Sequence, residues 1–148
     1  MACAGQDQPA EPGPPDEEVS FDLGPGGEVT LDVRVADSED ERSRGLMGLD
    51  SLRADEGMAF VFDGPTDGSF WMKDTLIPLS IAFVDDRGTI VTIREMEPCR
   101  HDPCPTYGAD ASYVLAVEAN AGYFERMGIT EGDYARLSEA ADPEGADG

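Results

Sequence analysis

Residues 79–93 have the sequence LSIAFVDDRGTIVTI, which contains two apolar runs separated by four polar residues. Each run has the length of a strand, and its Ile, Val, Phe and Thr side chains favour extended backbone. Asp85-Asp86-Arg87-Gly88 is a strong turn signal, because Asp binds nearby backbone N–H groups and Gly accepts a positive φ. This stretch therefore predicts an antiparallel β-hairpin.

Similar patterns recur on both sides of this hairpin. Apolar and polar residues alternate over 19–23 and 29–35, with turn residues 24–27 between them, which predicts a second hairpin. Further apolar runs predict strands over 58–62, 70–72, 113–117 and 133–137. The chain is therefore expected to consist mainly of short strands.

Two short helices are expected between these strands. Asp37 or Ser38 can accept a hydrogen bond from free backbone N–H groups at a helix start, and the acidic residues 39–41 suit its positive end. Residues 120–128 predict the second helix, which Gly128 would end. This content predicts a mostly β (α+β) fold, either a bent antiparallel sheet or a partly closed β-barrel, with a mixed sandwich as the alternative.

The two ends of the chain differ in composition from its middle. Residues 1–18 and 139–148 are rich in Pro, Gly, Ala and acidic residues without periodicity, which predicts a disordered N-terminal tether and a disordered tail. A single compact domain is expected over 19–138, since 148 residues suit one domain. No apolar run approaches the roughly 18 residues of a membrane span.

The charge balance excludes one class of partner. The chain has a formal net charge of −22, and residues 19–138 alone carry 23 acidic and 10 basic residues, a balance of −13. Such a surface repels nucleic acid, whose phosphates require Lys and Arg, and favours a soluble monomer. Nine of the ten basic residues are Arg. This composition is typical of salt-adapted proteins, although a GC-rich genome would also produce it.

Three cysteines bear on the compartment. Cys99 and Cys104 flank a short polar loop and are interpreted as a disulfide, which would place the protein in an oxidising, extracytoplasmic compartment. The alternative is a zinc site in which His101 and Asp102 join the two thiolates. Cys3 follows Ala2 and precedes a tether-like stretch, which is typical of a lipidated bacterial or archaeal cysteine. An accidental cysteine in a tail is the other reading.

Several motifs in order carry a family resemblance. They are RGLM at 44–47, GMAFVF at 57–62, FWMKDTLIPL at 70–79, IAFVD at 81–85, GTIV at 88–91 and YVLAVE at 113–118. Together they resemble the bacterial and archaeal domain-of-unknown-function family 192 over about residues 29–137. The resemblance implies a compact β-rich fold and no known activity. Asp74 stands where the family commonly has Asn, and Ser80 where it commonly has Asp.

The most unusual stretch, residues 70–75, suggests a ligand pocket. Trp71 with Phe60 or Phe62 would supply an aromatic wall, and Lys73 and Arg44 would supply a cationic group able to hold a carboxylate. The predicted ligand-binding set is Arg44, Phe60, Trp71, Met72, Lys73 and Thr75. In the alternative interpretation Trp71 and Met72 belong to the core, and Lys73 pairs with an acid.

The remaining chemistry is less specific. Five methionines suggest copper(I), but their spacing forms no cluster and Met commonly fills cores. No cofactor or metal is therefore expected. The leading hypothesis is a non-catalytic, extracytoplasmic module that binds a small molecule or a protein. An enzyme using carboxylates with Arg44, and a structural protein with an exposed apolar face, are the alternatives.

Overall fold

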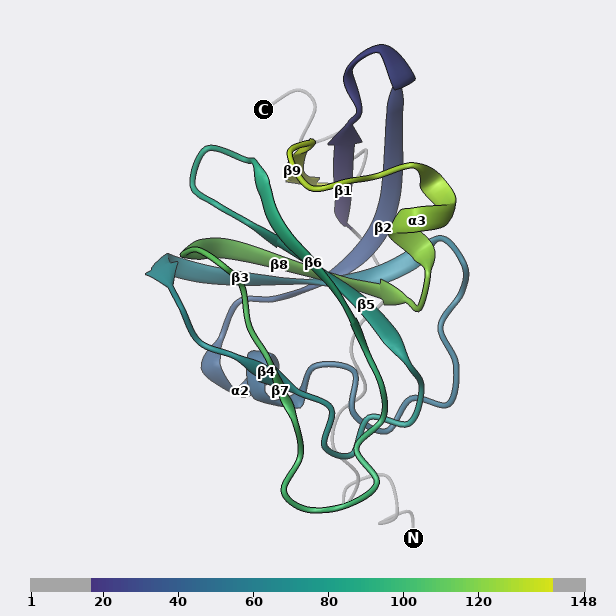
Figure 1. Ribbon diagram of the computed structural model, residues 1–148, viewed down its shortest axis with the longest axis vertical. Helices are drawn as coiled ribbons and strands as arrows, with labels where there is room; N and C mark the ends of the chain where they lie inside the picture. The colour runs from purple at the N-terminus through teal and green to yellow at the C-terminus, as the bar shows by residue number, and fades with distance from the viewer. Residues whose placement is uncertain (1–16, 140–148) are drawn as a thin grey trace, which may run out of the picture.

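The computed structural model describes residues 17–139, which form two sheets and two short helices (Figure 1). The strands are β1 (Glu17–Asp22), β2 (Glu28–Ala36), β3 (Glu56–Thr66), β4 (Phe70–Trp71), β5 (Leu79–Val84), β6 (Ile90–Met96), β7 (Thr106–Tyr107), β8 (Tyr113–Asn120) and β9 (Tyr134–Glu139). The helices are α2 (Glu39–Arg44), α3 (Tyr123–Met127) and a 3₁₀ turn, η1 (Gly24–Gly26). The mostly β fold with two short helices is thereby confirmed.

The large sheet has seven strands in the order β6-β5-β8-β3-β2-β1-β9. Both expected hairpins, β1–β2 and β5–β6, are antiparallel pairs. The sheet is not wholly antiparallel, however, because β2 and β3 run in the same direction. Parallel neighbours need a crossover connection. Here residues 37–55, which include α2, return the chain to the end at which β2 began.

The sheet curls until its two outer strands meet at one end. The backbone N–H of Ile90 donates to the carbonyl of Asp133 at 2.9 Å, and that of Ala135 donates to the carbonyl of Gly88 at 2.8 Å. An isolated bridge pairs Thr89 with Tyr134 between them. These hydrogen bonds join the turn between β5 and β6 to the start of β9, so the sheet forms a partly closed barrel.

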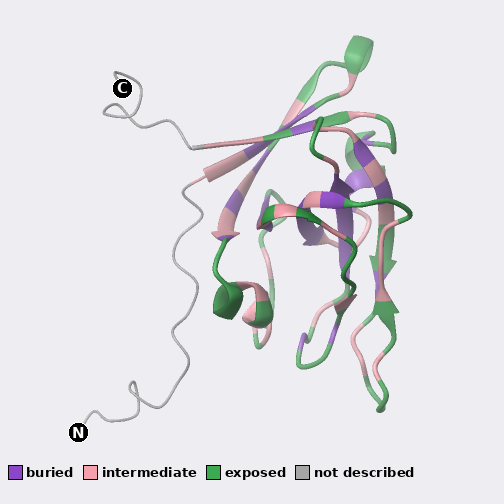
Figure 2. Ribbon diagram, turned by 90° about the vertical axis from the view of Figure 1, so that its left-hand side faces the viewer, coloured by how far each residue is buried: buried purple, intermediate pink, exposed green. Residues whose placement is uncertain are grey.

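Alternation along the strands creates two separate apolar cores. In β5, Ala82 and Val84 face the interior of the curl, where they join Phe21 of β1 and Phe124 of α3. Ile81 and Phe83 face the other side and belong to the second core. Figure 2 shows the buried segments running through the central strands, with exposed hairpin tips and loops.

The second core lies under a cap formed by α2, the loop that follows it and the small β4–β7 sheet. Figure 1 shows α2, β4 and β7 grouped on one side of the large sheet, while α3 lies at the opposite end, where it contacts β8. Phe70 of β4 pairs with Tyr107 of β7. The candidate site described below lies between this cap and the outer face of the sheet.

Strand β1 includes two residues that precede the predicted start of the domain at residue 19. Glu17 and Glu18 already belong to β1, where Glu18 pairs with Asp32 of β2 and Ser138 of β9. Residues 1–16 and 140–148, predicted as tether and tail, lie outside the described residues, and so does Cys3. Within residues 17–139, no helix has the length and apolarity that a membrane crossing requires.

Candidate functional site

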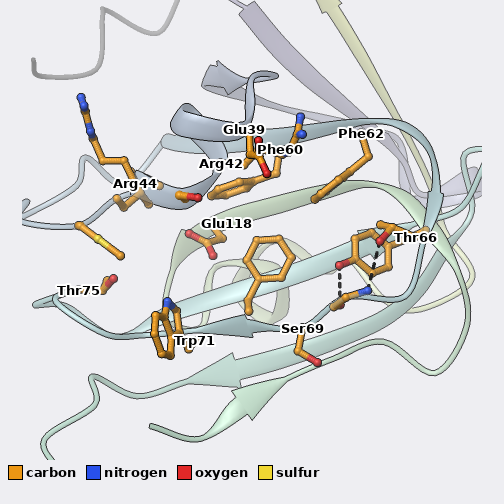
Figure 3. A pocket seen from close by; sticks show the side chains of 17 residues that line it. Glu39, Arg42, Arg44, Phe60, Phe62, Thr66, Ser69, Trp71, Thr75 and Glu118 are labelled. Carbon is orange, nitrogen blue, oxygen red and sulfur yellow. Dashed lines mark hydrogen bonds between the residues drawn. The ribbon is translucent and has the colours of Figure 1, made fainter.

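A cavity of about 360 Å³ opens between the cap and the outer face of the sheet. Its walls come from α2, β3, β4, β8 and the loops beside them, as Figure 3 shows. The lining residues are Glu39, Arg42, Ser43, Arg44, Gly45, Leu46, Met47, Phe60, Phe62, Thr66, Gly68, Ser69, Phe70, Trp71, Thr75, Tyr113 and Glu118. Segments far apart in the sequence thus meet around one space.

Strands β3 and β8 form the floor of the cavity. Phe60 and Phe62 lie two residues apart in β3, so their side chains point to the same face. Glu118 of β8 lies opposite Met58 of β3 and Ile81 of β5, both buried. The carboxyl group of Glu118 therefore lies between buried apolar side chains on this floor.

Helix α2 forms one wall, and local hydrogen bonds fix where it begins. The Ser38 hydroxyl accepts a bond from the Glu41 N–H at 3.1 Å, while the Glu41 carboxylate accepts from the Ser38 N–H at 3.2 Å. This capping box satisfies free N–H groups at the helix start. Bonds from the N–H groups of Asp37 and Ser38 also lower the pKa of Glu41.

One arginine attaches α2 to the floor. Arg42 donates from Nη1 to the carbonyl of Val61 at 2.8 Å, and its guanidinium lies 4.9 Å from the centre of the Phe62 ring. The helix ends at Gly45, whose φ of 50° suits glycine, and a Cβ there would lie 3.3 Å from the Phe60 ring. The close approach of the chain to Phe60 closes this side of the cavity.

Aromatic side chains form the opposite wall. The Phe70 ring contacts Phe60 edge to face at 5.1 Å between centroids, and Phe62 at 6.5 Å. Tyr113 donates its hydroxyl to the carbonyl of Gly68 at 2.6 Å, which fixes the loop before β4. Trp71 is 50% exposed. An aromatic surface therefore continues from the floor of the cavity to its mouth.

Glu118 is the chemically distinctive group of the site. It is only 5% exposed, and burial raises the pKa of its carboxyl to about 8. No hydrogen bond or ion pair found among residues 17–139 involves this side chain. Figure 3 shows its carboxyl in the middle of the cavity, between Phe60 and Trp71. A largely buried carboxyl that reaches an open cavity and bonds to no side chain or backbone group among residues 17–139 is unusual, and it marks a candidate site.

Comparison with known proteins agrees with the motifs in the sequence. Residues 22–137 match the DUF192 family, which is described as "Uncharacterized ACR". The chain belongs to this family. No curated protein sequence matches this DUF192 protein significantly.

Two solved structures resemble this DUF192 domain. A candidate transcription regulator from Sinorhizobium meliloti 1021 has a TM-score of 0.75 and 30% identity, covering 82% of this chain and 92% of its own. A protein of unknown function from Novosphingobium aromaticivorans DSM 12444 has a TM-score of 0.74 and 29% identity, covering 80% and 83%. The similarity extends over nearly the whole of both relatives.

The structure brings together four of the six predicted ligand-binding residues. Arg44, Phe60, Trp71 and Thr75 all line the cavity of this DUF192 domain. Figure 3 shows the Arg44 guanidinium directed away from Glu118. Arg44 therefore borders the cavity without approaching its buried carboxyl.

The other two predicted residues lie elsewhere. Met72 is 1% exposed and belongs to the second core, as the alternative interpretation of the sequence expected. Lys73 is absent from the cavity wall, and its Nζ lies 5.7 Å from the centre of the Trp71 ring. The expected cationic pair of Arg44 and Lys73 is therefore not directed at the cavity floor.

Sequence reasoning did not select Glu118 or Tyr113 as site residues. Glu118 follows the apolar run of β8 and shares the face of Ala116, a position at which a core side chain is expected. A carboxyl at such a position is rare unless it has a function or a partner. The presence of Glu at a position where a core residue is expected was the sequence signal that could have identified Glu118.

Two departures from the family pattern have structural explanations. Asp74 has a φ of 59°, a left-handed conformation that Asn and Asp tolerate better than most residues. Ser80 is fully buried, donates to Glu95 at 2.6 Å and accepts a bond from the Gly122 N–H at 2.8 Å. Asp74 thus occupies a left-handed turn position, and Ser80 belongs to a buried hydrogen-bond network.

The cysteine loop is closed by a disulfide between Cys99 and Cys104, with an S–S distance of 2.09 Å. The bond occupies both sulfur atoms, so neither is the free thiolate that zinc requires. Within residues 17–139, no three His, Cys, Asp or Glu side chains form a group that could hold a metal ion.

Proposed function

We propose that this DUF192 domain is a non-catalytic module that binds a small molecule in the cavity under α2. The observation that carries the proposal is a buried carboxyl, Glu118, without a partner among the described residues, facing an open cavity. A ligand group that bonds to it would supply the partner that the described residues do not provide.

The size and composition of the cavity support this role. Its volume of about 360 Å³ lies in the range of small-molecule sites, which combine apolar walls with few polar groups. Phe60, Phe70 and Trp71 offer flat apolar surface, and Thr75 and Ser69 offer hydroxyl groups. A compact ligand with an apolar body and one polar end fits this arrangement.

A nucleic-acid ligand fits the chain poorly. One structural relative is described as a candidate transcription regulator, but the balance of −13 over residues 19–138 opposes phosphate binding. The disulfide favours a location outside the cytoplasm, where such bonds persist. We therefore place the binding module in an extracytoplasmic compartment.

A catalytic role is the second candidate, because a carboxyl with a pKa of about 8 can exchange protons near neutral pH. Its weakness is that Glu118 makes no hydrogen bond to a nucleophile or a second acid among the described residues. Turnover of a bound compound, abolished by Glu118→Gln, would favour catalysis over simple binding.

The binding proposal is tested by thermal unfolding of the complete chain with a panel of small amines, carboxylates, sugars and peptides. A true ligand raises the Tm, as mass action requires. Trp71→Ala, which removes part of the cavity wall, should reduce that shift, whereas the matched variant Lys73→Ala outside the wall should largely keep it. The proposal fails if no compound in the panel raises the Tm of the wild type.

A further inference from the structure

Resting on the proposed binding function, we propose that the ligand group buried against Glu118 is a protonated amine. The Glu118 carboxyl lies in a cavity whose walls include the rings of Phe60, Phe70 and Trp71. An ammonium group donates charge-assisted hydrogen bonds to a carboxylate and is attracted to ring faces. One chemical group would thus satisfy both features of the site.

The cations of the protein do not satisfy Glu118 themselves. Arg42 binds the carbonyl of Val61 and lies over Phe62, and Lys73 lies over Trp71. These contacts demonstrate that rings at the edge of the site hold cations on their faces. Arg44 is directed away from Glu118 (Figure 3). Among residues 17–139, no cationic side chain bonds to the Glu118 carboxyl, so that position is left for a cation from outside.

The charge of the whole domain favours the same ligand. Residues 19–138 carry a balance of −13, which raises the local concentration of cations and repels anions. A carboxylate ligand, expected from the sequence, would face both Glu118 and Glu39 in the cavity. The ammonium inference therefore replaces that expectation.

Proton release should accompany this binding. Burial raises the pKa of Glu118 to about 8, so the empty site is mostly protonated at neutral pH and must ionise to hold an ammonium group. The other charged or titratable groups of the lining are Glu39, Arg42 and Arg44 from α2 and Tyr113 from β8. Burial raises the pKa of Tyr113 to about 12, so it remains neutral.

The test is isothermal titration calorimetry at about pH 7 with benzylamine, benzyl alcohol and benzoate, which share a ring and differ in charge. Benzylamine should bind at least about tenfold tighter than the other two, since a bond to a charged partner exceeds a neutral one. The binding enthalpy of benzylamine should vary with the ionisation enthalpy of the buffer, with a slope that corresponds to the release of nearly one proton.

Two variants assign the effect to Glu118. Glu118→Gln should weaken benzylamine binding by about tenfold or more and leave benzyl alcohol within about twofold. Glu125→Gln makes the same substitution in α3, outside the cavity wall, and should leave the preference intact. Circular dichroism verifies that each variant is folded. If Glu118→Gln does not fold, the inference is tested by two wild-type measurements: the preference for benzylamine over the other two compounds, and the proton release that accompanies its binding.

Several results would overturn the inference. Equal or tighter binding of benzyl alcohol or benzoate, or unchanged benzylamine affinity in Glu118→Gln, would exclude an ammonium partner while leaving the binding function intact. Failure of benzylamine, cyclohexylamine and tetramethylammonium alike would also exclude it. Only failure of the whole panel of compounds would remove the binding function as well.

Discussion

Replacing Glu118 by Gln should make the domain more stable at alkaline pH. The pKa of Glu118 is about 8 in the folded protein against 4.5 for a free side chain, a difference of about 3.5 units. Because the folded pKa is raised, its favourable contribution is complete below about pH 4.5 and is lost as pH rises to about 8. At 1.36 kcal/mol per unit, ionisation costs the folded state about 5 kcal/mol.

Gln has nearly the shape of a protonated Glu and carries no charge at any pH. The free energy of unfolding of Glu118→Gln should therefore equal that of the wild type within about 1 kcal/mol near pH 4. It should exceed the wild-type value by several kcal/mol near pH 9. Subtracting the wild-type free energy of unfolding from that of Glu118→Gln at each pH removes the effect that pH has on the many other acidic groups of the chain.

Urea denaturation at half-unit steps from about pH 4 to about pH 9 measures this difference. Glu125→Gln, on the exposed side of α3, serves as control and should change stability by no more than about 0.5 kcal/mol throughout. A difference between Glu118→Gln and the wild type that stays flat across the series would contradict the burial argument. A difference that rises only below pH 5 would do so as well.

Three further predictions concern the rest of the domain. Replacing Cys99 and Cys104 by Ser should lower the free energy of unfolding by about 2 kcal/mol, because a loop closed over a sequence separation of 5 is opened; equal urea midpoints for both proteins would contradict this. Ser80→Ala should cost about 1–3 kcal/mol, since a buried hydroxyl that bonds to Glu95 and Gly122 is lost; a negligible change in calorimetric stability would assign no role to this network. Raising KCl from about 0.1 M to about 2 M should raise the Tm, because salt screens the repulsion between acidic side chains on the surface. An unchanged Tm would contradict salt adaptation and favour codon usage as the origin of the acidic, Arg-rich composition.

Most strands were predictable because the local signals are strong and agree with one another. The β5–β6 hairpin follows from two apolar runs around Asp85–Gly88, and α2 begins at Ser38, one of the two expected caps. These features depend on neighbours in the sequence. The parallel pairing of β2 with β3 depends instead on where the 37–55 crossover returns, which local patterns do not determine.

The site was only partly predictable for a related reason. Unusual residues at 70–75 suggested a ligand pocket, and two of them, Trp71 and Thr75, line the cavity. Sequence proximity also suggested Met72 and Lys73, but strand and loop geometry directs them elsewhere. Glu118 is 43 residues beyond Thr75 in the sequence, and only the pairing of β8 beside β3 brings it into the same cavity.

The division of the cavity between sheet and cap has a consequence for redesign. Glu118 lies in a strand that pairs on both sides, with β3 and β5, so its position is set by the hydrogen-bonded framework of the sheet. The facing surfaces come from α2 and the segment around β4, neither of which takes part in the seven-stranded sheet. Side chains there can be exchanged to enlarge or reshape the cavity while the sheet and the Glu118 carboxyl keep their positions.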